Sequence, residues 1–454
     1  MQHRGQNILL LVASYIFYMT WDWRFISLIL LSTIVDYYCG IQVRDSKDKK
    51  KFFVAVSMVV NLAVLGFFKY YNFFTENLVE LTSVFGWQPD DLTLNIILPV
   101  GISFYTFQTM SYTIDIYRKE IEPERNILNF ALFVSFFPQL VAGPIERAKN
   151  LLPQIQTKRI ISKEMVRNGI WMIAWGFYLK IFIADNLAFV VDRVFATDEV
   201  IAGGEALFGI YAFAFQIFGD FAGYSSIAIG VGALMGFTLR TNFLFPYFVT
   251  NPQNFWHNWH ISLSSWLRDY LYIPLGGNRG GEMMLYRNLF LTMLLGGIWH
   301  GAAWTFVIWG IYQGSILMVH RYYSPKFKKL GAFLKVNTLP DSWVHAFKVL
   351  FMFQVTCFGW LIFRANSIDQ ILNFTYSIFF NFMTITPATK YYFLLLCFYA
   401  IPLLLIQHFQ IRFKSENTLD RFPAYARTLI YVGIYFCIIA LGEYGTRQFI
   451  YFQF

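Results

Sequence analysis

Apolar runs of about twenty residues recur from one end of this sequence to the other. Only 14% of the 454 residues are charged and 57% are hydrophobic, whereas about a quarter of a soluble domain is charged. Inside a bilayer, backbone polar groups must be satisfied within the protein, so each such run predicts a transmembrane helix. The sequence therefore predicts an all-α polytopic membrane protein.

Ten stretches are candidate membrane spans, and two shorter ones are expected to be re-entrant or interfacial helices because they are too short to cross alone. The spans are 8–21, 25–43, 52–74, 94–117, 169–191, 206–237, 288–320, 344–363, 391–411 and 429–449, and the shorter stretches are 128–142 and 263–275. We expect about ten to twelve transmembrane or re-entrant helices. They would form one membrane domain over residues 1–454, since no long stretch is polar enough for a separate soluble domain.

The net charge of +9 comes from short Lys- and Arg-rich loops that alternate with acidic loops. Loops of this kind stay in the cytoplasm, which predicts that residues 47–51, 147–167, 321–335 and 412–427 share one side of the membrane. Nucleic-acid binding is disfavoured, because the basic clusters are scattered between hydrophobic spans.

With these loops on one side, residues 288–320 must cross the membrane an even number of times within 33 residues. Two full crossings need about forty residues. We therefore expect a hairpin of short helices, broken at residues 296–301, where the sequence is Gly-Gly-Ile-Trp-His-Gly. Broken backbone at membrane depth is tolerated only where protein or a water-filled cavity shelters it, so the hairpin would enclose His300.

His300 ends an apolar run and lies between Trp299 and Gly301. An ionisable group inside a membrane is costly and is usually functional, whereas a lone His in a soluble core is more often structural. The residues alone leave both interpretations open. Burial would keep the imidazole neutral, as a general base requires, and flanking glycines would let a substrate approach the backbone.

The densest polar stretch, residues 255–270, leads into residues 271–279 and brings His257, His260, Arg268 and Asp269 together within thirteen residues. An interfacial belt would explain its aromatic residues, because Trp favours the headgroup region, but it explains four ionisable residues poorly. We therefore favour a functional cluster over a belt. If the stretch is helical, one face carries His260, Ser264 and Leu267 and another carries Trp256, Trp259 and Leu263.

Other ionisable residues in apolar spans are expected to form structural ion pairs or to snorkel from helix ends. They are Asp36, Lys69, Asp115, Lys180, Asp220, Arg364, Glu443 and Arg447. The four cysteines form no C-x-x-C pair, which predicts neither a zinc site nor a disulfide framework, and no other metal site is indicated. A Gly-x-Ser-x-Gly elbow is absent, which disfavours a self-contained serine hydrolase.

Six motifs follow one another along the chain: Pro99–Gln108, Ser135–Ile145, Phe218–Ser225, Trp259–Asn278, Trp299–Gly301 and Ile362–Ala365. Each is weak alone, but the six in this order are specific. They resemble the membrane-bound O-acyltransferase family, most closely its bacterial branch, which is typified by alginate O-acetyltransferase and related to the D-alanyl transferase of teichoic acids. The resemblance runs through most of the chain, with core motifs within residues 99–310.

The resemblance implies an α-helical funnel with His300 as the catalytic histidine and His260 as the second histidine of the bacterial branch. It also implies residues that position the donor or substrate: Trp299, Asn258, Trp259, Arg268, Asp269, Asp220 and Asn278. Members of the family commonly have an arginine where this chain has Asn258, and often an acidic residue where it has Ser226. These differences concern the substrate or the partner, not the assignment to the acyltransferase class. Relatives also carry one more N-terminal helix, so either the start is placed late or that helix is lost.

The implied reaction moves an acyl group, expected to be acetyl, from a cytoplasmic thioester such as acetyl-CoA to hydroxyls of an exported polysaccharide. No bound cofactor is implied, because the thioester is a substrate. Relatives act in the inner membrane, usually beside an extracytoplasmic acyltransferase or esterase-like partner. The alternatives are transfer of D-alanine or of a longer acyl chain to a cell-envelope polymer, lipid or protein, a transporter or channel, and a scaffold for a polysaccharide exporter.

Overall fold

The computed structural model describes residues 2–86, 92–333, 340–413, 422–445, 447 and 449–450, and the regular structure of this part of the chain is helical, without a β-strand. Seven segments within it are long and apolar enough to cross a membrane. They are Trp23–Asp45, Lys50–Val84, Lys163–Val194, Gly203–Leu234, Asp341–Arg364, Pro387–Phe413 and Ala424–Leu441. The predicted class, an all-α polytopic membrane protein, is confirmed.

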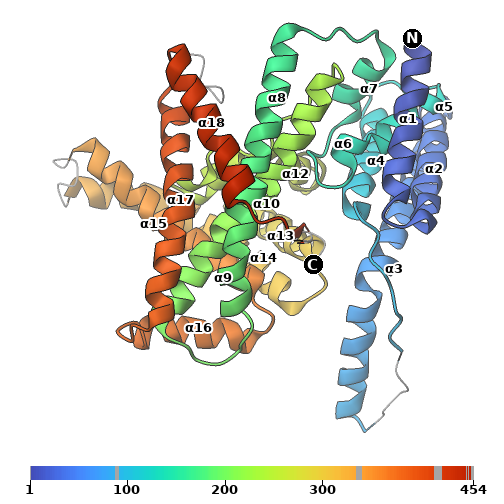
Figure 1. The fold of residues 1–454 in the computed structure, drawn as a ribbon. Helices are drawn as coiled ribbons and strands as arrows, with labels where there is room; N and C mark the ends of the chain where they lie inside the picture. The colour runs from blue at the N-terminus through green and yellow to red at the C-terminus, as the bar shows by residue number, and fades with distance from the viewer. Residues whose placement is uncertain are drawn as a thin grey trace. The chain divides into compact units, whose positions relative to one another are not determined.

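The chain divides into two compact units, residues 1–173 with 228–240, and residues 174–227 with 241–454. Whether they act as the single domain predicted for residues 1–454 stays a prediction. The helices of the first unit are α1 (His3–Met19), α2 (Ile26–Asp45), α3 (Lys50–Val84), α4 (Ile102–Tyr117), α5 (Ile127–Ser135), α6 (Phe137–Leu140) and α7 (Ala148–Gln156), with the short η1 (Trp23–Phe25) before α2 (Figure 1). Helix α8 (Lys163–Phe177) begins in this unit and ends in the second.

A buried carboxylate joins α2, α3 and α4. Asp36 on α2 accepts hydrogen bonds from Asn61 on α3 (2.7 Å) and from Thr113 on α4 (3.2 Å), and it also accepts one from Ser57 on α3. A polar group in apolar surroundings is costly unless it is hydrogen-bonded. This cluster therefore fixes the packing of the three helices.

The predicted span at 94–117 is wrong at its first end. Helix α4 begins only at Ile102, because Pro99 cannot donate a helical hydrogen bond and Gly101 adopts a left-handed φ of 74°. A Cβ on Gly101 would lie 2.4 Å from the carbonyl oxygen of Leu140, so the glycine is required for this close approach.

The second unit contains the polar stretch and the predicted hairpin. Its helices are the π-helix η2 (Tyr178–Ala184), α9 (Asp185–Val194), α10 (Gly203–Leu234, which ends in the first unit), η3 (Pro246–Phe248), α11 (Pro252–Asn258), α12 (Ile261–Leu267), the π-helix η4 (Arg268–Tyr272), α13 (Glu282–His300), α14 (Trp304–Phe333), α15 (Asp341–Arg364), α16 (Ile368–Phe380), α17 (Pro387–Phe413) and α18 (Ala424–Leu441). The predicted span at 429–449 is too long, since α18 ends at Leu441.

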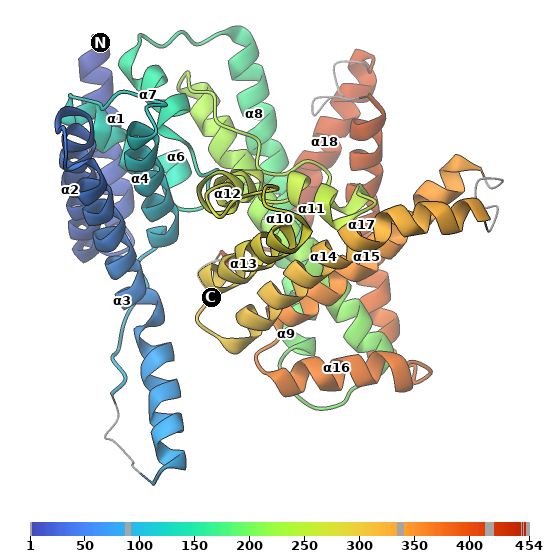
Figure 2. The same cartoon turned by 180° about the vertical axis from the view of Figure 1, so that it is seen from behind.

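The predicted hairpin is present: α13 ends at His300, the chain breaks at Gly301, and α14 packs back against α13 (Figure 2). Its helices are longer than expected, because α13 also includes residues 282–287 and α14 continues to Phe333. Glycines allow the close packing, since a Cβ on Gly297 would lie 2.5 Å from the oxygen of Phe306 and one on Gly310 would lie 2.8 Å from that of Met293.

Candidate active site

The polar stretch is broken at His260, which separates α11 from α12. His260 has φ 43° and ψ 54°, a left-handed conformation that is uncommon for a residue with a side chain. The face proposed for a continuous helix is therefore wrong: His260 precedes α12 and turns away from the spacing that a helix would impose. Such a conformation costs free energy and is concentrated at functional sites, which singles out His260.

Asn242 fixes the orientation of the His260 imidazole. Asn242 Oδ1 accepts a hydrogen bond from the backbone N–H of Ser262 (3.2 Å), which identifies this atom as the amide oxygen. The same oxygen lies 3.2 Å from His260 Nδ1, so the neutral ring carries its proton on Nδ1 and keeps Nε2 as its basic nitrogen. The amide nitrogen of Asn242 donates to Ser225 Oγ (3.2 Å), which holds the amide in place.

Aromatic rings bury His260 completely. Phe221 on α10 meets the imidazole edge to face, with ring centroids 4.5 Å apart, and Phe243 lies nearly parallel to it at 6.4 Å. Burial of this kind disfavours the charged ring and lowers the pKa of His260 to about 3. His260 is therefore a neutral imidazole at physiological pH.

His300 lies at the end of α13 in an aromatic enclosure and is only 6% exposed. Its ring centroid is 5.0 Å from those of Trp299 and Trp309 and 5.4 Å from that of Phe363. The predicted shelter around His300 is therefore present. Gly301 makes it possible, because a Cβ there would lie 2.0 Å from Cε2 of Phe306.

A continuous layer of rings connects the two histidines. From His300 it runs through Phe363 to Trp360 (5.7 Å between centroids) and then to Trp259 (4.7 Å). Trp259 packs on Phe243 at 5.0 Å, and Phe243 faces His260. The structure thus joins His260, His300, Trp259 and Trp299 in one apolar wall of the second unit.

Other predicted site residues lie nearer the surface. Arg268 pairs with its neighbour Asp269 (2.7 Å), and Asn278 accepts a hydrogen bond from Tyr272 (2.6 Å). The amide of Asn258 donates back to the carbonyl of Asn254 (2.7 Å), which ends α11. These contacts hold the local chain, so a role toward a substrate stays a prediction for all four predicted residues.

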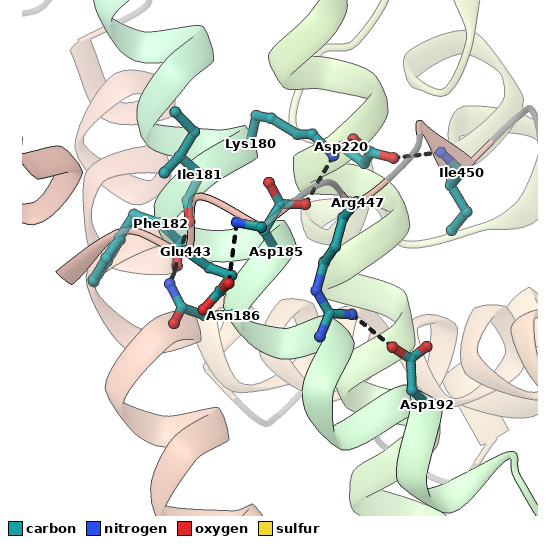
Figure 3. A network of polar contacts seen from close by, with 11 residues as sticks. Lys180, Ile181, Phe182, Asp185, Asn186, Asp192, Asp220, Glu443, Arg447 and Ile450 are labelled. Carbon is teal, nitrogen blue, oxygen red and sulfur yellow. Dashed lines mark hydrogen bonds and ion pairs between the residues drawn. The ribbon is translucent and has the colours of Figure 1, made fainter.

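Asp220 belongs to a buried ion-pair network, in agreement with the structural alternative for intramembrane charges (Figure 3). Lys180 Nζ lies 2.7 Å from Asp220 and 2.8 Å from Asp185, so one cation serves two carboxylates. Asp220 also accepts a hydrogen bond from the backbone N–H of Ile450 (2.7 Å). Asp220 directly precedes Phe221 on α10.

Sequence reasoning missed Asn242, Phe221, Trp309 and Phe363, which surround the two histidines. Each comes from a different part of the chain, and Phe221 and Phe363 lie in motifs that were recognised only as motifs. Among the described residues, His, Cys, Asp and Glu form no group of three or more that could hold a metal ion. The arrangement therefore offers two buried imidazoles in an apolar wall, which suits proton transfer.

A known family and several known proteins are similar to this chain in sequence. Residues 15–361 match the family model described as MBOAT, membrane-bound O-acyltransferase family. The protein named probable alginate O-acetylase AlgI in Pseudomonas aeruginosa is 42% identical, over 84% of this chain and 71% of that protein. The peptidoglycan O-acetyltransferase of Helicobacter pylori is 34% identical, over 80% of this chain and 72% of that protein. The teichoic acid D-alanyltransferase of Bacillus subtilis is 30% identical, over 62% and 72%, respectively.

Proposed function

This chain belongs to the membrane-bound O-acyltransferase family, and on that premise we propose that it transfers an acetyl group from acetyl-CoA toward hydroxyls of an exported polysaccharide. The observation that carries the proposal is the enclosure of His300 by Trp299, Trp309 and Phe363 at the broken end of α13. A buried imidazole in an apolar wall is a suitable base for a hydroxyl group.

In the proposed reaction, His300 takes the proton of the acceptor hydroxyl while the hydroxyl oxygen attacks the thioester carbonyl. The carbon–sulfur bond then breaks, the acyl group remains on the oxygen as an ester, and the thiolate takes the proton from His300. No net proton is gained or lost. His260, held neutral by burial and oriented by Asn242, positions the donor or assists the proton transfer.

The acetyl donor and polysaccharide acceptor are supported by the names of the relatives from Pseudomonas aeruginosa and Helicobacter pylori, both of which are named for acetyl transfer. Transfer of D-alanine is a second candidate, supported by the relative from Bacillus subtilis. Both candidates use one chemistry, since an activated acyl group is passed to a hydroxyl. They differ in whether the donor carries a free amine.

We place the enzyme in the inner membrane, with its thioester donor on the side of the basic loops. The bacterial relatives and the Lys- and Arg-rich loops at 47–51 and 147–167 support this location. We also propose an extracytoplasmic acyltransferase or esterase-like partner that completes delivery to the polymer. Acetyl-CoA would enter as a substrate, and the described residues need no bound cofactor for the step above.

The experiment compares wild type, His300→Ala and His300→Gln at matched expression, with His345→Gln on the exposed start of α15 as control. The readout is the radiolabel that passes from acetyl-CoA to the exported polymer or to a co-purifying protein. Glutamine can hydrogen-bond but cannot take a proton, so both His300 variants should lose transfer by a factor of about 10² or more. Near wild-type transfer in His300→Gln would contradict the proposal, and labelling from a D-alanyl donor alone would favour the second candidate.

A further inference from the structure

Described residues after α18 contact η2, α9 and α10 at several points (Figure 3). The side-chain amide of Asn186 donates to the carbonyl oxygen of Leu441 (3.0 Å). The backbone N–H of Glu443 donates to the carbonyl oxygen of Ile181 (3.2 Å). Arg447 forms an ion pair with Asp192 (2.6 Å). We name the described residues of this segment, Gly442–Gly445, Arg447, Phe449 and Ile450, the strap.

A buried attachment is the hydrogen bond from the backbone N–H of Ile450 to Asp220 Oδ2, at 2.7 Å. A carboxylate accepts a stronger hydrogen bond than a neutral oxygen does, and the bond is not weakened by water here. Lys180 Nζ lies 2.7 Å from the other oxygen of Asp220, so the ion pair fixes the direction of this side chain.

The backbone around this pair is built for close contact. Lys180 projects from the π-helix η2, a wide turn that interrupts α8 and α9 and is often found at functional sites. A Cβ on Gly223 would lie 2.8 Å from the oxygen of Gly176, and one on Gly219 would lie 2.8 Å from that of Leu179. These glycines let α10 approach η2 closely enough for Lys180 to reach Asp220.

Beyond this attachment, the strap contacts the wall of His260. The ring of Phe449 lies 5.2 Å from Tyr224 and 5.8 Å from Phe221, and Phe449 and Ile450 are both buried. Phe221 in turn meets His260 edge to face, with ring centroids 4.5 Å apart. The strap is therefore separated from His260 by one aromatic ring.

We propose that the strap is part of the acyl-transfer site: bound to Asp220 through Ile450, it holds Phe221 against His260 and keeps water from the imidazole. Phe449, Ile450 and Asp220 are thus positioning residues that act through Phe221. The reason for a buried Lys180–Asp220 pair is then the anchoring of the strap. This inference rests on the proposed function for its consequence on catalysis, but not for its effect on the exposure of His260.

The test uses the full-length protein purified in detergent and the histidine reagent diethyl pyrocarbonate, with modification at each histidine followed by mass spectrometry. Ile450→Pro removes the N–H donor but leaves Lys180 and Asp220 paired. A hydrogen bond to a charged group contributes enough that its loss should open the strap about tenfold more often. His260 should be modified about tenfold faster, with the rate at His300 unchanged. Ile450→Val keeps the donor and should keep His260 protected.

Phe449→Leu provides a second variant, because it removes the ring that supports Phe221 without changing the backbone. It should also expose His260 and lower kcat for acyl transfer by about tenfold with little change in KM, as expected for a positioning defect. General destabilisation would instead increase modification of both histidines, and that result would contradict the inference. An unchanged rate of modification at His260 in Ile450→Pro and Phe449→Leu would also contradict the inference, even if the wild-type protein is shown to transfer acetyl groups.

Discussion

Asn242 gives the two nitrogens of His260 different roles, since Nδ1 faces the amide oxygen and Nε2 remains the basic atom. The enclosure of His300 is formed by the rings of Trp299, Trp309 and Phe363. An imidazole oriented by an amide and an imidazole enclosed by aromatic rings are suited to different roles. We therefore expect the two histidines to respond differently to substitution.

His260→Ala should retain measurable acyl transfer in folded protein, whereas His300→Ala should not. Loss of a positioning group lowers the rate in a graded way, while loss of the base removes a factor of about 10² to 10⁴. The measurement is kcat with acetyl-CoA for both variants, normalised to folded protein by size-exclusion chromatography. An inactive His260→Ala beside an active His300→Ala would reverse the two roles.

The buried His260 should also make the protein less stable in acid. Its folded pKa of about 3 lies below the ordinary value of 6.5, so between these values the unfolded chain binds a proton that the folded chain does not. The contribution of His260 is therefore complete above pH 6.5 and is lost as the pH falls toward 3, on the order of a few kcal/mol.

His260→Gln should consequently lose less thermal stability than wild type between pH 7 and pH 4.5. The measurement is the Tm of each protein in detergent, by intrinsic fluorescence, at both pH values. The difference between the two decreases in Tm is the contribution of His260. Equal decreases in the two proteins would mean that His260 is accessible to protons in the folded state.

At the scale of elements, the long helices and the α13–α14 hairpin could be predicted, because hydropathy and the parity of basic loops depend only on sequence. The break at His260 could not be predicted, because the spacing of apolar residues around it is compatible with a continuous helix. The break follows from the left-handed backbone conformation of His260. The same holds for Ile102, where a close approach between Gly101 and Leu140 decides the boundary. Asn242 and Phe221 approach His260 only through tertiary packing.

The break after α13 yields a prediction about glycine. Gly301→Ala places a Cβ 2.0 Å from the ring of Phe306, so that ring must move, and with it the wall of Phe363 on which Phe306 packs at 5.0 Å. Acyl transfer should fall at least tenfold, since displacements of about 1 Å at a site are that costly. Gly433→Ala is the matched control, because a Cβ on this glycine of α18 meets nothing within 4 Å.

In the control, alanine favours the helix by about 0.5–1 kcal/mol, so its activity and expression should equal or exceed those of wild type. The measurement is acetyl transfer per folded molecule. If Gly301→Ala and Gly433→Ala had the same activity, close packing at the hairpin tip would be irrelevant to the site.

For the whole molecule, the direction of the reaction depends on which side of the membrane receives the thioester. The basic loops at 47–51, 147–167, 321–335 and 412–427 should all be cytoplasmic, because short Lys- and Arg-rich loops are retained there. The acidic loop that contains Asp198 should lie on the opposite side. The parity behind this assignment requires that residues 288–320 form a hairpin, and α14 does pack back against α13.

Single cysteines introduced into each loop, in a background without the four native cysteines, would test this orientation with a membrane-impermeant maleimide on intact cells. Cysteine at Asp198 should react directly, whereas the four basic loops should react only after the membrane is permeabilised. In the proposed reaction, a cytoplasmic thioester and an exported acceptor meet at His300, and this requires the orientation described above. Strong labelling of two or more basic loops in intact cells would invert the parity, and the thioester would then face the wrong side.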